Sequence, residues 1–176
     1  ALEVLKSRKF ISEFIERHNI LVPLIAANGW SAESGQIKID PDIYDIESAK
    51  WLRSTKPPRE ANPSLQEAYA EFRRILSVNQ DKSSGLVKVS VEHYSPVVAK
   101  QWVDWLIEDL NANIMQQDVL EAEQAINYLN DQVASTSLAD LQGVFFKLIE
   151  EQTKVVMLAK VSSEYMFRTL DPAVIP

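Results

Sequence analysis

Residues suited to acid–base or metal chemistry are few in this chain. Its 176 residues include two histidines, His18 and His93, and no cysteine. The lack of cysteine excludes disulfides, thiolate metal sites and cysteine nucleophiles. No second metal ligand stands at a recognisable spacing from either histidine, which favours ordinary structural roles for both. Glu92, His93 and Tyr94, at the end of a predicted strand, are kept as a candidate for an enzyme that modifies lipids or sugars.

The sequence does not match the common motifs for binding calcium or phosphate or for presenting a nucleophilic serine. Asp40, Asp42 and Asp45 resemble a calcium loop, but a tyrosine, an aspartate and a tryptophan occupy the places of a ligand, the glycine and the final acid. Gly29 and Gly35 are separated by five residues and followed by glutamine, so they do not form a phosphate-binding loop. No G-x-S-x-G element occurs. We therefore expect no catalytic residue, no metal site and no cofactor.

Four tryptophans could stack on sugar rings: Trp30, Trp51, Trp102 and Trp105. Trp102 and Trp105 lie three residues apart at the start of a long predicted helix, beside Val98 and Leu106. This spacing places them on one helix face. Packing in the core is the simpler interpretation, and we favour it.

The net charge disfavours a nucleic-acid partner. Lysine and arginine total 18 against 25 aspartates and glutamates, a formal charge of −7, which would repel a phosphate backbone. One local run is basic and contains Lys50, Arg53, Lys56 and Arg59. Such a run is usually a solvated surface, although near a bilayer it could face anionic headgroups.

Composition favours helices, because four glycines are too few for a turn-rich β architecture. Apolar spacing predicts helices over residues 1–18 and about 65–78. Alternation of valine with polar residues predicts a strand over 86–94, with Val87, Val89 and Val91 turned toward a core. Shorter strands are expected near 36–39 and over 164–170.

The longest predicted element begins at Ser95-Pro96, a suitable N-cap and first-turn proline. No proline or glycine interrupts the chain from Val97 to residue 142, and the helix is expected to end near residue 136. A helix of roughly 40 residues spans about 60 Å, whereas a compact domain of this length is only about 40 Å across. The helix is therefore expected to project from the globule.

Apolar residues spaced alternately by three and four predict a seam between this helix and the next. The seam residues in the first helix are Val119, Ala122, Ile126, Leu129 and Val133. In the second they are Leu138, Leu141, Phe145, Leu148, Gln152, Val155 and Ala159. A short turn would make the two helices antiparallel.

The second helix also carries apolar residues away from this predicted seam, more than a two-helix hairpin can cover. We select Phe146, Ile149, Val156 and Met157 as candidates for an interface between copies of the chain.

Together these elements predict an α+β fold, a small mixed α/β base with a long projecting antiparallel helical hairpin. We expect a single domain, with its base in residues 1–95 and 161–176 and its hairpin in residues 96–160.

Two segments resemble a known family. Residues 85–111, GLVKVSVEHYSPVVAKQWVDWLIEDLN, are similar to the Wzz-type chain-length determinants, the polysaccharide co-polymerases of bacterial inner membranes. Residues 164–176, EYMFRTLDPAVIP, resemble the segment that in this family precedes a proline-rich stretch and the second transmembrane helix. Residues 7–15 and 63–69 also fit, so the resemblance covers nearly the whole chain.

The resemblance implies the periplasmic domain of an inner-membrane protein whose two flanking transmembrane helices lie outside this sequence. It implies a homo-oligomer that sets the length of a surface polysaccharide such as O-antigen. Its partner would be the polysaccharide polymerase of the inner membrane, and polymerisation would belong to that separate enzyme. The resemblance leaves open whether the growing polysaccharide is also bound.

A periplasmic adaptor of an export or efflux machine is the alternative, because such adaptors also carry an α-hairpin. They add barrel and lipoyl-like domains built from many short strands punctuated by glycine. The scarcity of glycine in this chain argues against that alternative.

Overall fold

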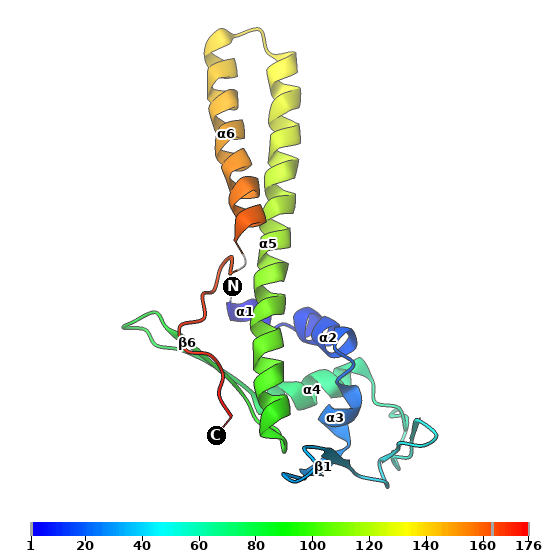
Figure 1. Ribbon diagram of the computed structural model, residues 1–176. Helices are drawn as coiled ribbons and strands as arrows, with labels where there is room; N and C mark the ends of the chain where they lie inside the picture. Colours follow the sequence, from blue (N-terminus) through cyan, green and yellow to red (C-terminus); the bar gives the residue numbers. More distant parts are fainter. Residues whose placement is uncertain (1, 163, 176) are drawn as a thin grey trace. The chain divides into compact units, whose positions relative to one another are not determined.

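The computed structural model describes residues 2–162 and 164–175, a chain of mixed helix and strand in which helix predominates (Figure 1). It divides into two compact units. The first contains residues 1–106 and 172–176, and the second contains residues 107–171. The division falls within the longest helix, after Leu106, and each unit is described by itself.

The first unit contains four short helices and the beginning of a long one. These are α1 (Leu2–Lys6), α2 (Arg8–Arg17), α3 (Leu21–Ile25), α4 (Leu65–Ile75) and the first part of α5 (Pro96–Ser135). The single helix predicted over residues 1–18 is divided at Ser7. The Ser7 hydroxyl accepts a hydrogen bond from the Phe10 amide at 3.2 Å and caps α2.

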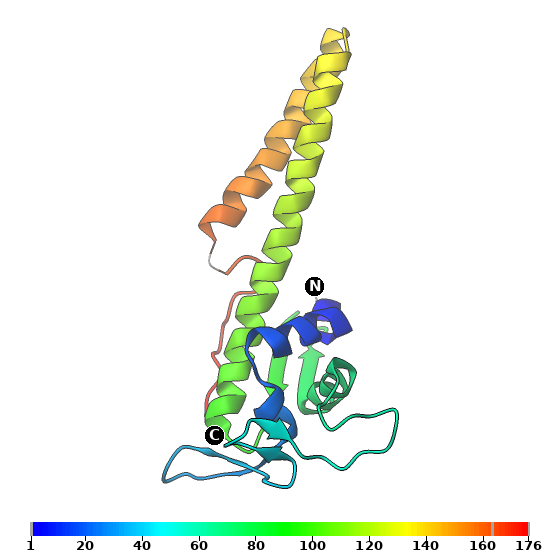
Figure 2. The same ribbon diagram turned by 90° about the vertical axis from the view of Figure 1, so that its right-hand side faces the viewer.

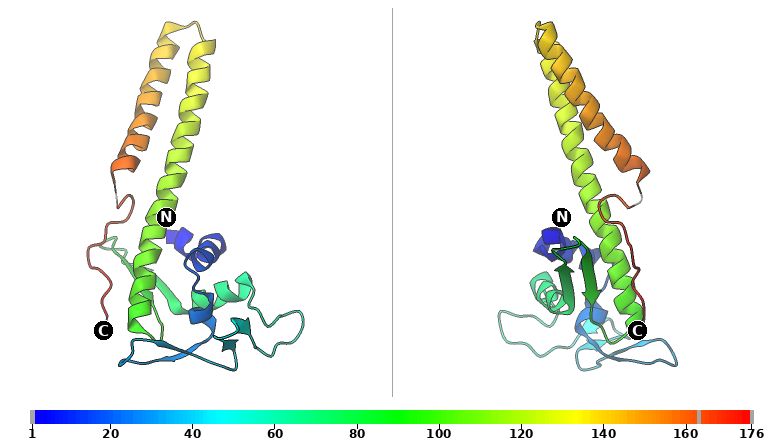
Figure 3. Two further views of the ribbon diagram at one scale, coloured as in Figure 1. Left: turned by 45° about the vertical axis from the view of Figure 1, so that its right-hand side comes forward. Right: turned by 90° about the vertical axis from the view of Figure 1, so that its left-hand side faces the viewer.

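In the described part of the chain, six strands form three antiparallel pairs. They are β1 (Ala27–Trp30) with β2 (Ile37–Ile39), β3 (Tyr44–Asp45) with β4 (Lys50–Trp51), and β5 (Leu76–Gln80) with β6 (Val87–Val91). Strand β6 confirms the prediction from valine alternation, because its valines are half-buried and Lys88 and Ser90 are exposed. Strand β5 was not expected, since the predicted helix continues to residue 78. Figure 3 shows the β5–β6 pair within the first unit.

The core of the first unit is built from aromatic and aliphatic side chains of α2, α4 and α5. The rings of Phe14 and Phe72 lie 5.3 Å apart, and Phe72 lies 5.9 Å from Trp102. All three are almost completely buried. The interpretation of Trp102 as a core residue is confirmed, and this packing holds the first turns of α5 in the unit.

The second unit contains the rest of α5 and α6 (Ala139–Val161), joined by residues 136–138. The two helices run in opposite directions from this link (Figures 1 and 2). The prediction of a continuous helix ending near residue 136 is confirmed by α5. At the link, the Gln142 side-chain amide donates a hydrogen bond of 2.9 Å to the Thr136 carbonyl.

The seam prediction is correct for α5 and partly wrong for α6. All five predicted α5 residues are buried or half-buried, with Ala122 and Leu129 the most buried. Leu138, which precedes α6, and Leu141 and Leu148 within it are exposed. The residues of α6 that are not exposed are Gln142, Phe145, Ile149, Gln152, Val155, Val156 and Ala159. Phe145, Gln152 and Ala159 belong to both the predicted and the observed row, whereas Gln142 and Ile149 replace Leu141 and Leu148. The helix is therefore turned by roughly 50°, about half of one residue step, from the predicted orientation.

The strand predicted for residues 164–170 does not form. This segment carries no strand in the part of the chain that is described. Instead, Asn111 of α5 binds its backbone through the side-chain carboxamide. Tyr165 and Phe167 are half-buried and Met166 and Arg168 are exposed, as the predicted alternation of these pairs requires, but a side chain rather than a neighbouring strand supplies the hydrogen bonds.

Candidate interaction surface

The composition of α6 favours a helix, and many of the exposed residues on its surface are apolar. It contains no proline and one glycine, Gly143. Its three acidic and three basic residues cancel, 3 − 3 = 0, and Glu150 and Lys154 pair one turn apart at 2.7 Å. The charges therefore give the helix no net repulsion toward another copy of itself.

The four candidate residues divide into two pairs. Phe146 and Met157 are 57% and 63% exposed, whereas Ile149 and Val156 are half-buried. Phe146 and Met157 are eleven residues apart, close to three helical turns, so they share one flank of α6. Ile149 and Val156 belong to the least exposed row of α6. The structure thus leaves Phe146 and Met157 as the more accessible part of the predicted surface.

The opposite flank of α6 is also apolar, and the sequence analysis did not select it. Leu141, Val144, Leu148 and Leu158 are all exposed, between 39% and 60%. With Glu151 and Val155 they repeat at alternating steps of three and four. This second repeat is present in the sequence, but three of its members, Leu141, Leu148 and Val155, were assigned to the internal seam. We call this row and the Phe146–Met157 flank the α6 apolar surface.

Helix α5 differs sharply in charge within the second unit. Its residues 107–135 include six acidic residues and no lysine or arginine: Glu108, Asp109, Asp118, Glu121, Glu123 and Asp131. Two such helices brought together would repel each other. Contact between copies of the second unit is therefore more favourable through α6 than through this part of α5.

Both histidines are held by structural contacts in the first unit. His93 Nε2 lies 2.9 Å from the Pro23 carbonyl oxygen, and Nδ1 accepts a hydrogen bond of 3.1 Å from the Ser95 amide. This arrangement places the ring proton on Nε2. The His18 ring stacks on Trp105, with centroids 4.2 Å apart. Among the described residues, no group of three or more histidines and carboxylates is placed to hold a metal ion.

The aspartates that resembled a calcium loop stabilise turns. Asp40 accepts a hydrogen bond of 2.9 Å from the Asp42 amide, and Asp45 accepts one of 3.1 Å from the Glu47 amide. Asp45 also accepts a short hydrogen bond from the Ser48 hydroxyl. These bonds, led by that from Ser48, lower the pKa of Asp45. Each carboxylate is engaged with its own turn.

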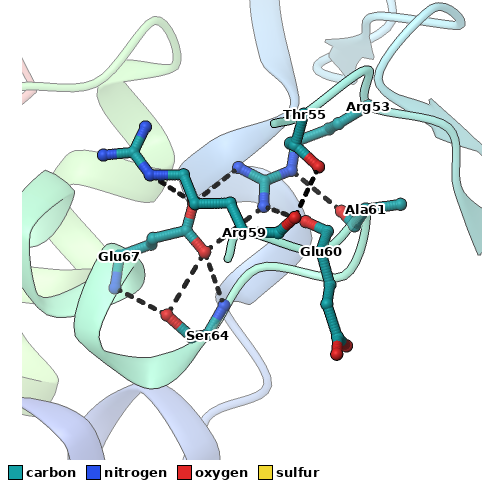
Figure 4. Close-up of polar contacts among 7 residues, drawn as sticks. All are labelled: Arg53, Thr55, Arg59, Glu60, Ala61, Ser64 and Glu67. Atoms are coloured by element: carbon teal, nitrogen blue, oxygen red, sulfur yellow. Dashed lines mark hydrogen bonds and ion pairs between the residues drawn. The ribbon is translucent and has the colours of Figure 1, made fainter. Parts of the chain in front are cut away.

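Arg53, from the basic run, is part of an internal cluster (Figure 4). Its guanidinium donates to the carbonyls of Ala61 at 2.9 Å and Glu60 at 3.0 Å, and to the Glu67 carboxylate at 3.2 Å. The Arg53 side chain is only 17% exposed, whereas Arg59 is 71% exposed. The basic run therefore does not form a uniformly exposed positive patch, because Arg53 is hydrogen-bonded to the loop before α4 and to α4 itself.

The remaining tryptophans pack in the first unit. Trp51 packs against Tyr44 across the β3–β4 pair, with the ring centroids 4.9 Å apart in an edge-on arrangement. Trp30 is half-buried, and its indole nitrogen has no hydrogen-bond partner within the described residues. None of the four tryptophans lies on the α6 apolar surface.

Comparison with known proteins gives no relative for this chain. No family model matches it, and neither the curated proteins nor the solved structures searched contain a significant match. Among the described residues, no helix has the combination of length and apolarity required to cross a bilayer.

Proposed function

We propose that this chain is a non-enzymatic regulator of bacterial surface polysaccharide length that works as a homo-oligomeric scaffold. The observation that carries the proposal is the α6 apolar surface, which is exposed on both flanks of an electrically neutral helix. The part of the proposal that concerns polysaccharide rests on the resemblance of residues 85–111 and 164–176 to the chain-length determinants. O-antigen or a related lipopolysaccharide is the substrate class that this resemblance supports.

The proposal includes an arrangement of the molecule. The second unit would project as an antiparallel hairpin from an α/β base that lies near the inner membrane, on its periplasmic side. Copies would pack laterally through α6 and hold the membrane polymerase in a defined geometry. A continuous α5 of 40 residues supports this arrangement, because one helix passes from the first unit into the second.

A scaffold role also agrees with what the polar residues do. His93, Asp45 and Arg53 each engage the backbone or side chains of their own unit. The proposed work of the protein is geometric, and the bond-forming chemistry belongs to the polymerase.

Deletion of the gene tests the polysaccharide part of the proposal. The surface polysaccharide should still be made, but its modal band on a gel should disappear and lengths should become broadly distributed. Restoring the gene should restore the band. An unchanged band in the deletion strain would contradict the proposal, as would a complete loss of polymer.

Cross-linking of the native protein tests the interface. Phe146→Glu and Met157→Glu place a charge in the exposed flank and should shift the cross-linked products toward the monomer, with unchanged helical content by circular dichroism. Gln124→Glu makes the same charge change at an exposed position of α5 and serves as the control. Identical cross-linking patterns for all three variants would exclude the Phe146–Met157 flank as an interface.

A further inference from the structure

The segment of residues 164–170 is bound to α5 by side chains rather than by a strand. The Asn111 carbonyl oxygen accepts hydrogen bonds from the amides of Met166 at 3.1 Å and Phe167 at 2.8 Å. Its amide nitrogen donates to the Phe167 carbonyl at 2.9 Å. One carboxamide thus performs the pairing that a neighbouring strand would otherwise provide.

Asn111 is an unusual residue type for a buried position inside a helix. It is 5% exposed, and it stands between Leu110 and Ile114 on a buried part of α5. Asparagine is a poor residue for a helix interior, and a buried carboxamide is costly unless its groups are hydrogen-bonded. Its three bonds to residues 166 and 167 supply that compensation.

A second, weaker interaction lies two turns further along α5. Tyr165 is half-buried, and burial, followed by the influence of the Asp118 carboxylate, raises the pKa of Tyr165. Asp118 follows Asn111 by seven residues, so both lie on the same side of the helix. Within the segment, the Thr169 amide donates to Glu164 at 3.2 Å. Among the described residues, the segment therefore has three hydrogen bonds to Asn111 and one internal bond.

We propose that residues 164–170 form a detachable strap, latched by Asn111, which opens as one local unit while α5 and α6 remain folded. Strands are normally stabilised by a ladder of backbone bonds, whereas this segment depends mainly on the side chain of Asn111. Five of its seven residues are exposed, including Met166 and Leu170. A segment with few buried contacts and few attachments opens at low free-energy cost. Opening would separate residues 164–170 from α5.

Amide hydrogen exchange of the whole chain, resolved by residue with NMR, tests this strap. Asn111→Ala should accelerate exchange at Met166 and Phe167 by about tenfold, the effect of losing buried hydrogen bonds. If the strap opens as one unit, the Thr169 amide should accelerate similarly, although it does not contact Asn111. Acceleration confined to Met166 and Phe167 would overturn the proposal.

Two further variants keep the test decisive. Tyr165→Phe removes only a hydroxyl and should also accelerate Met166 and Phe167, which lack any bond to that hydroxyl. Asn113→Ala changes a half-buried asparagine of the same helix and should leave the strap unchanged. If Asn111→Ala instead accelerated α5 and α6 as much as the strap, Asn111 would be a support of the whole unit and the latch would be refuted.

Discussion

His93 uses both ring nitrogens on the backbone of the first unit. It connects the carbonyl of Pro23, which lies within α3, with the amide of Ser95, which immediately precedes α5. Its ring also lies 4.9 Å from that of Trp102. The residue thus joins segments that are 70 positions apart in the chain, and its role in this structure is to hold the beginning of α5.

Replacing His93 by alanine should destabilise the first unit. The change removes two hydrogen bonds and leaves the amide of the fully buried Ser95 without its acceptor. We expect the free energy of unfolding to fall by about 2 kcal/mol, measured by urea denaturation. The exposed neighbour Glu92→Ala is the control and should change it by less than about 0.5 kcal/mol. Equal stability of the two variants would contradict a structural role for His93.

The sequence argued only against a metal role for His93, because no second ligand stood at a recognisable spacing, and it kept His93 with Glu92 and Tyr94 as a catalytic candidate. It could not predict Pro23 as the contact, since that pairing depends on the placement of α3 beside β6. Asn111 was missed for the same reason. Nothing near it in the sequence indicates a partner 55 residues away, although an asparagine inside a long apolar helix was a signal that it bonds to something.

Among the elements, α4 shows how local sequence signals and a distant contact combine. Ser64 and Glu67 form a capping box, in which the Glu67 amide donates to the Ser64 hydroxyl at 3.2 Å and the Ser64 amide donates to the Glu67 carboxylate at 3.0 Å. Arg53 binds the same carboxylate. The Ser64 backbone bond, and then Arg53, lower the pKa of Glu67.

The lowered pKa of Glu67 predicts a dependence of stability on pH. Because the pKa is lower in the folded than in the unfolded chain, the stabilisation is present at neutral pH and is lost as pH falls through the folded value. The difference in unfolding free energy between the unchanged protein and Glu67→Gln should therefore shrink below about pH 4. Denaturation curves between pH 7 and 3 measure it, with the exposed Glu33→Gln as control. A difference that stays constant with pH would show that the Glu67 charge contributes nothing.

Elements with one clear period were predictable, and those with two competing patterns were not. Strand β6 follows directly from its alternating valines. Strand β5 was missed because Ile75 and Leu76 continue the apolar stripe of α4, with no glycine or proline to mark the change. In α6, apolar residues occupy both the 141, 148, 155 row and the 149, 156 row, so spacing alone could not decide which row is buried.

At the scale of the whole molecule, the two units differ in how completely they cover their apolar residues. The first unit buries the aromatic cluster of Phe14, Phe72 and Trp102. The second has few buried residues and many exposed large apolar ones, chiefly on α6. Extended exposed apolar surfaces usually mark contacts with another protein. Lateral packing of α6 in an oligomer would cover them and is the basis of the proposed scaffold.

The length distribution of the surface polysaccharide in cells that carry Phe146→Glu in the native protein tests this account most directly. Protein abundance should match that of the control Gln124→Glu, and both should contain folded protein. The account predicts that Gln124→Glu preserves the modal band on a gel, whereas Phe146→Glu loses it while polymer is still made. A normal modal band with Phe146→Glu, together with normal oligomer size, would contradict the claim that this exposed flank of α6 assembles the scaffold.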